Sequence, residues 1–365
     1  MNDATTGPTP GQASPGRATV NWRAVGLFYL IAVAGCSLAA GVLVLVGSRM
    51  GSGATGIVAG AAAMLAPLIA GLIVERFVLR RRTLLSRGWA SFLAAKLRTI
   101  GRIAAWGAVG YVAVVAGMFA VAALASGRVP GAGTWATQAQ FDQILTAAQP
   151  ILAGRSVPIG LVVGSGFIQA LVAGFTINGI FAFGEEYGWR GVLADQLAPL
   201  GVVRANLLTG VVWGLWHAPL IALGHNYGDQ WAIGIWLFVV ITTPLSFILW
   251  WARQRSGSVV APAVVHGAFN GFASVFVLLL VGADRLIALP VGVLAGVALS
   301  LVALVLWLVP GLRPRQPLPV RASTDRRGFS GGRVSPQLDA AATLARRRFL
   351  SPPPGGTCPT PAAST

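Results

Sequence analysis

Two adjacent carboxylates and an arginine stand at the end of a long apolar stretch, in the run of residues 183–191. Charged side chains within membrane spans usually face a bundle interior or a wet cavity, because a charge at the bilayer centre costs about 2.5 to 3.5 kcal/mol. Glu186 and Arg190 lie four residues apart, so on a helix they share a face and can form an ion pair. Glu185 is rotated from Glu186 by about 100°. We therefore expect one carboxylate to be structural and the other, Glu185, to be free for chemistry.

Two of the three histidines, His217 and His266, lie within apolar segments rather than in loops. Asn270 follows His266 by four residues and shares its helix face. Together with Glu185, these residues supply a general base, proton shuttles and an oxyanion donor. Glu185, His217 and His266 equally form a set of ligands for a divalent metal such as zinc, with an open position for water. Either arrangement suits hydrolysis. The third histidine, His225, lies in a short loop and is interpreted as solvated.

The composition predicts that these residues lie in a membrane protein. Of the 365 residues, 55% are hydrophobic and only 10% are charged, which is typical of a polytopic membrane chain and not of a soluble domain. The net charge of +17 would suit nucleic acid, but the arginines lie between apolar segments and in the C-terminal part, without an aromatic-interleaved basic face. We predict an all-α membrane helix bundle, with membrane lipid and no nucleic acid among its partners.

Eight apolar segments are long enough to cross about 30 Å of hydrocarbon. They are residues 24–46, 54–74, 103–125, 158–183, 206–223, 231–251, 259–281 and 286–309. If the N-terminus is inside, only Arg49, Arg128, Arg155 and Arg285 of the 27 basic residues lie outside. Because cytoplasmic loops carry the excess of Lys and Arg, both termini are predicted to be cytoplasmic.

Changes in composition divide the chain into four regions. These are a disordered lead at 1–20, membrane helices with a basic cytoplasmic loop at 21–155, a core with all the candidate site residues at 156–310, and a disordered Arg- and Pro-rich cytoplasmic tail at 311–365. Residues 84–100 alternate basic and apolar side chains, which fits an amphipathic surface helix and a plain loop equally well. Glu75, beside Arg76 at a membrane end, is interpreted as an interface residue.

The candidate residues also resemble the three motifs of a known family, the CAAX prenyl endopeptidase and bacteriocin-processing family of intramembrane proteases. The pattern Glu185-Glu186-x-x-x-Arg190 is similar to its first motif, and His266-x-x-x-Asn270 to its third. His217 matches the histidine of the second motif. There the phenylalanine usual four residues earlier is replaced by Trp213, a position that we assign to packing. The resemblance covers roughly residues 181–276.

The resemblance implies a fold and a set of roles. The fold would be an eight-helix bundle with a conical cavity open to the cytoplasm and the lipid. Glu185 would activate the attacking water with His217, while His266 and Asn270 would stabilise the oxyanion and the ion pair of the first motif would hold the site in shape. The family is named as metalloprotease and also described as glutamate-dependent, so a zinc cofactor stays open.

The leading hypothesis is an endopeptidase that hydrolyses a peptide or protein near the cytoplasmic face of a multi-pass cell membrane protein. The scarcity of lysine beside many arginines suggests GC-rich coding, so a bacterial inner membrane is the expected location. One alternative is a proton- or ion-coupled transporter that uses the same residues as a relay, although we find no convincing internal repeat. Another is a noncatalytic relative that gives immunity to a secreted peptide.

Overall fold

The computed structural model describes residues 19–51, 53–83 and 97–313. Helices make up nearly all regular structure in these ranges, and the two short strands form one antiparallel ladder. The predicted all-α fold class is confirmed. The predicted lead at 1–20 and tail at 311–365 lie almost entirely outside the described residues, as does most of the segment 84–100.

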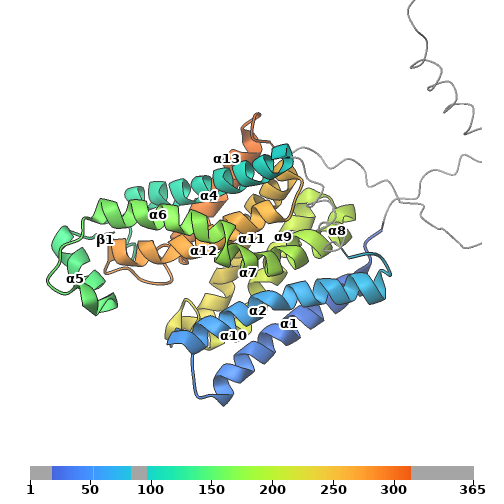
Figure 1. The fold of residues 1–365 in the computed structure, drawn as a ribbon, viewed down its shortest axis with the longest axis horizontal. Coiled ribbons are helices and arrows are strands. Elements are labelled where there is room, and N and C mark those ends of the chain that lie inside the picture. Colours follow the sequence, from blue (N-terminus) through green and yellow to red (C-terminus); the bar gives the residue numbers. More distant parts are fainter. Residues whose placement is uncertain (1–18, 52, 84–96, 314–365) are drawn as a thin grey trace, which may run out of the picture. The chain divides into compact units, whose positions relative to one another are not determined.

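The elements follow one another along the chain as numbered in Figure 1. They are α1 (Trp22–Leu45), α2 (Gly53–Ile73), η1 (Val74–Val78), α4 (Leu97–Ala125), β1 (Thr134–Trp135), α5 (Gln138–Ala148), η2 (Pro150–Leu152), α6 (Ile159–Phe175), α7 (Ile177–Glu186), η3 (Tyr187–Leu193), α8 (Ala194–Leu197), η4 (Ala198–Leu200), α9 (Val202–Trp216), α10 (Ala218–Ala222), η5 (Gly228–Gln230), α11 (Trp231–Ser256), α12 (Val260–Leu279), β2 (Leu280–Val281) and α13 (Val293–Leu308).

The number of complete spans is smaller than the eight that the sequence suggests. In the described part of the chain, six helices are long and apolar enough to cross a membrane, and the count is seven if the bent pair of α6 with Ile177–Leu200 is one broken span. The expected eighth span, at 286–309, is shortened because residues 282–292 form turns and α13 has only 16 residues. A straight helix of that length falls short of the roughly 20 residues that a span needs.

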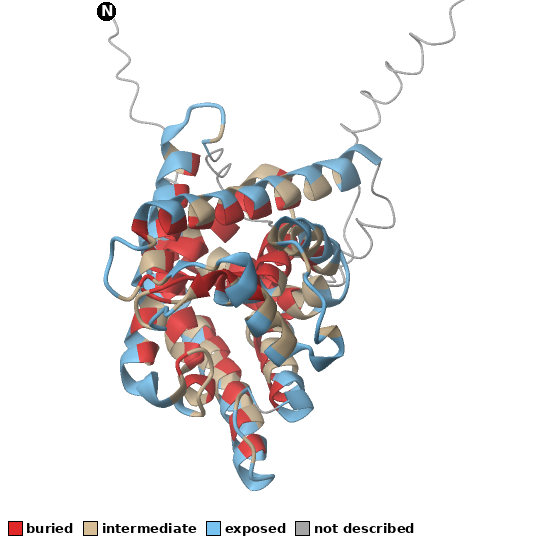
Figure 2. Cartoon of the chain, turned by 90° about the vertical axis from the view of Figure 1, so that its left-hand side faces the viewer, coloured by how far each residue is buried: buried red, intermediate tan, exposed pale blue. Residues whose placement is uncertain are grey.

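The outer surface of the bundle fits a lipid environment. Figure 2 shows buried residues on the inward faces of the helices and exposed residues on the outward faces. Many of the exposed residues are large and apolar: Leu38 is 70% exposed, Ile57 74% and Leu124 73%. A soluble protein rarely exposes apolar patches of this extent. The chain is a multi-pass membrane protein.

A break between α6 and α7 turns the helix that carries the first motif. The two axes differ by 54°, and Thr176 at the break is far from helical geometry, with φ −125° and ψ −114°. Gly179 permits the break because a Cβ there would overlap the carbonyl oxygen of Gly174. The Asn178 amide donates to the carbonyl oxygen of Gly267 on α12 at 3.2 Å. The break therefore packs α7 against the helix that carries the third motif.

Helix α9 is held between α11 and α1, which positions His217 at its C-terminal end. A Cβ at Gly214 would lie 2.7 Å from the Cα of Val239, so only glycine lets α9 approach α11 this closely. On another side of α9, the Trp216 indole donates to the carbonyl oxygen of Ala32 in α1 at 2.9 Å.

Candidate active site

The first motif lies where an α-helix changes into a π-helix. Helix α7 ends at Glu186, and the π-helix η3 continues directly from it. Such π turns are rare and occur often at functional sites. Glu185 is 2% exposed, Glu186 0% and Arg190 1%, so all three charges are buried. Buried charges of this kind need partners.

Glu186 joins the first motif to the third. Its Oε1 lies 3.0 Å from Nη1 of Arg190 and also 3.0 Å from Nδ1 of His266. The expected i, i+4 ion pair is thus present, and it includes a histidine from 80 residues further along the chain. The Arg190 guanidinium also covers the ring of Trp213, with its Cζ 4.0 Å from the ring centroid. This cation–π contact adds to the stabilisation of the buried cation.

Glu185 makes a different set of contacts from its neighbour. Its Oε2 accepts a hydrogen bond from Nε1 of Trp213 at 2.6 Å. Its Oε1 accepts no hydrogen bond from any residue in the described ranges, and it is not among their fully buried unpaired atoms. One oxygen of this carboxylate is held in place while the other is accessible, which is the arrangement that a general base requires.

His217 has its tautomer set by the backbone. Its Nδ1 lies 2.9 Å from the carbonyl oxygen of Trp213. A carbonyl can only accept, so Nδ1 carries the proton and Nε2 of the neutral ring has a free lone pair. The imidazole packs edge-on against Trp216 and Phe238, with ring centroids 4.5 and 4.6 Å away.

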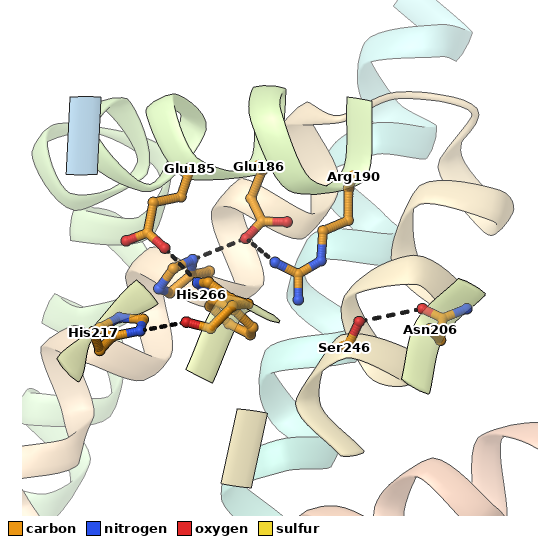
Figure 3. A network of polar contacts seen from close by, with 8 residues as sticks. Glu185, Glu186, Arg190, Asn206, His217, Ser246 and His266 are labelled. Atoms are coloured by element: carbon orange, nitrogen blue, oxygen red, sulfur yellow. Dashed lines mark hydrogen bonds and ion pairs between the residues drawn. The ribbon is translucent and has the colours of Figure 1, made fainter. Parts of the chain in front are cut away.

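The structure brings five of the six predicted site residues into a single cluster around Trp213. Figure 3 shows Glu185 and Glu186 extending from one helix toward His217 and His266. Asn270 lies one turn after His266 on α12, at an exposed position, and makes no hydrogen bond to another described side chain. It is therefore on the correct helix but outside the hydrogen-bonded cluster.

Trp213 is the residue whose importance the sequence reasoning missed. Its expected role is packing, but it contacts a residue of each motif: Glu185, His217 and His266. The signal was present in the replacement of the usual phenylalanine, because an indole adds an N–H donor that a phenyl ring lacks.

Glu75 also differs from its interpretation as an interface residue. It is fully buried in η1, directly after α2, where Oε2 accepts from the Tyr187 hydroxyl at 2.6 Å and Oε1 from Nε of Arg81 at 3.1 Å. Tyr187 is the first residue of η3, so Glu75 anchors the motif helix to α2.

The donor set does not support the predicted metal site. Among the residues that the structure describes, no three His, Cys, Asp or Glu side chains are grouped so that they could hold a metal ion. Nδ1 of His217 and Nδ1 of His266 are bonded to protein oxygens, which leaves Nε2 of each ring as the nitrogen that could meet a metal ion. Metal dependence stays a prediction for experiment.

A separate cavity of about 600 Å³ lies among the connections at one end of the helices. Its lining includes Arg49, His225 and Arg285, and none of the predicted site residues. His225 is only partly exposed, and burial lowers its pKa to about 4. His225 is therefore a loop residue as expected but is only partly solvated, because it lines this cavity together with residues of the neighbouring connections.

Comparison with known proteins shows which family the segment that contains the cluster resembles. Residues 164–272 match the model of the family described as type II CAAX prenyl endopeptidase Rce1-like. All three motifs lie within the matched residues, and the family resemblance predicted from them is confirmed.

A curated relative supports the same assignment. CAAX prenyl protease 2 of Methanococcus maripaludis is 32% identical to this chain over 94 residues, which are 24% of this chain and 34% of the relative. The chain therefore matches about a third of the length of that relative.

Proposed function

We propose that this chain is an intramembrane endopeptidase of the CAAX protease type, acting on a peptide or protein at the cytoplasmic face of the cell membrane. The observation that carries the proposal is the state of Glu185. Its carboxylate is buried, one oxygen is held by Trp213 and the other is uncommitted, within a domain that matches the Rce1-like family.

The first step is the attack of water on the scissile carbonyl carbon. Oε1 of Glu185 accepts a proton from the water, and Nε2 of His217 orients the water by accepting a second hydrogen bond. This role for His217 follows from its tautomer, which leaves Nε2 as the acceptor.

The second step is the collapse of the tetrahedral intermediate. The C–N bond breaks, and the proton on Glu185 passes to the leaving nitrogen, so the products are a carboxylic acid and an amine. Glu185 is again a carboxylate and is ready for another turnover. During these steps, His266 in its imidazolium form donates from Nε2 to the oxyanion, while its Nδ1 is held by Glu186. Asn270, on the exposed side of α12, supplies the second oxyanion donor from its amide.

The direct test uses purified protein in lipid nanodiscs and peptides released from membranes. Candidate substrates come from proteomics of membrane peptides in cells that carry the wild-type protein or the Glu185→Ala variant. Peptides cut only with the wild type are synthesised with and without a prenyl group and assayed with the purified protein. The proposal predicts cleavage that Glu185→Gln abolishes while the thermal unfolding temperature is retained. Cleavage that survives Glu185→Gln would overturn the mechanism.

A further inference from the structure

Trp213 lies at the centre of the cluster, on α9, one helical turn before His217. It is 2% exposed. Its indole nitrogen, its ring and its backbone carbonyl each make a contact with a different motif residue. These three contacts point to a function for Trp213 beyond filling space.

The indole N–H holds one oxygen of the general base. The distance of 2.6 Å from Nε1 to Oε2 of Glu185 is short for an N–H···O bond, as charge-assisted bonds are. Because Oε2 is occupied, the carboxylate is held in one rotation, and Oε1 is the oxygen that meets water. A phenylalanine at this position has no donor and would leave the carboxylate free to rotate.

The ring and the carbonyl fix the other partners. The ring lies beneath Arg190 at 4.0 Å and edge-on to His266, with centroids 5.5 Å apart. The carbonyl oxygen accepts from Nδ1 of His217 at 2.9 Å. Two further donors of Arg190, Nε and Nη2, are buried without a hydrogen-bond partner in the described residues, so the aromatic face is a major part of the surroundings of this cation.

We propose that Trp213 is a positioning residue that selects Oε1 of Glu185 as the proton acceptor. The inference rests on the proposed endopeptidase function and deepens it. A misplacement of reacting groups by about 1 Å can cost about a hundredfold in rate, so loss of the indole donor has a kinetic effect even when the fold is retained.

Trp251 on α11 is a matched control. It is 0% exposed, and its indole also donates one hydrogen bond, at 2.7 Å, but the acceptor is the backbone oxygen of Leu312. Trp213→Phe and Trp251→Phe therefore remove the same indole donor from buried sites, and only the first loses a contact with Glu185.

The test compares kcat, KM and the thermal unfolding temperature of the two variants in nanodiscs. We expect Trp213→Phe to lower kcat about 10- to 100-fold with KM within about twofold of wild type. We expect Trp251→Phe to leave kcat within about twofold of wild type, although it also lowers the unfolding temperature through the loss of a buried hydrogen bond. A kcat for Trp213→Phe within twofold of wild type, or an equal fall in both variants, would assign Trp213 to packing alone.

A second measurement separates this proposal from the proposed function. A double-mutant cycle on the unfolding temperature, with Trp213→Phe and Glu185→Ala, reports their coupling without any need for activity. Coupling together with the kcat result supports the positioning role, and absence of coupling overturns it. If the wild type cleaved no membrane peptide, the proposed endopeptidase function and the kinetic role of Trp213 would both be overturned, whatever coupling the double-mutant cycle showed.

Discussion

The buried carboxylates of Glu75 and Glu185 differ in how many of their oxygens accept hydrogen bonds. Glu75 has both oxygens engaged, by the Tyr187 hydroxyl and by Arg81, whose Nη2 lies 3.0 Å from Oε1. Glu185 has only Oε2 engaged, by a neutral indole. A carboxylate whose oxygens are all occupied holds helices together, whereas one with an accessible oxygen can accept a proton. Burial alone, which the two share, does not separate the structural site from the chemical one.

The hydrogen bonding of Glu186 is intermediate between that of Glu75 and that of Glu185. Its Oε1 serves both Arg190 and His266, while Oε2 is buried without a partner in the described residues. An unpaired buried oxygen costs stability. The contacts of Oε1 with Arg190 and His266 offset this cost and link the first motif to the third.

The largest expected effect is that of Glu185→Gln. The amide keeps the size of the side chain and can still accept from the indole, but it cannot take a proton from water. We expect kcat to fall by about 10² to 10⁴, the usual contribution of a general base, with the unfolding temperature retained. Kinetics and thermal unfolding in nanodiscs measure both quantities.

Glu186→Gln should affect stability and activity together. The change leaves Arg190 buried without its anion, and breaking a buried pair in this way typically costs about 3 to 5 kcal/mol. A lower unfolding temperature and a lower kcat are both expected. If Glu186→Gln lost activity alone while Glu185→Gln lost stability, the two glutamates would have the reverse roles.

Tyr187→Phe should affect stability and leave the chemistry intact. It removes the hydroxyl that donates to Glu75, and the loss of a buried hydrogen bond to a charged group costs about 1.5 to 3 kcal/mol. Denaturation of the variant should show this loss, with kcat changed less than about threefold, a bound of about 0.7 kcal/mol in activation free energy. A fall in kcat as large as that of Glu185→Gln would contradict the division between the two sites.

The smallest effect is expected from chelation of metal ions. Since the described side chains do not group into a metal site, we expect incubation with a chelator to leave kcat unchanged. If the chelator abolished activity and added zinc restored it, the result would show instead that Glu185 acts on a metal-bound water. Metal analysis of the purified protein is the companion measurement.

The charged and polar residues of the site could be found from local spacing. Glu186 and Arg190 were paired correctly because an i, i+4 relation depends only on helix geometry. The same helix geometry rotates Glu185 by about 100° from Glu186 and so places it outside this ion pair. The apolar segments likewise predicted the membrane fold, since their length and lack of charge depend on no tertiary contact.

What the sequence by itself determined is therefore the set of candidate residues, their order on apolar helices and the class of chemistry. Tertiary structure alone decided which atoms are free. The bonds from Trp213 to Glu185 and from His266 to Glu186 join residues 28 and 80 positions apart, and the hydrogen bond that Glu75 accepts comes from Tyr187, 112 positions away. Spacing rules reach only one helical turn. Beyond that distance, the packing of whole helices determines which donor meets which oxygen, and it left one oxygen of Glu185 without a partner in the described chain.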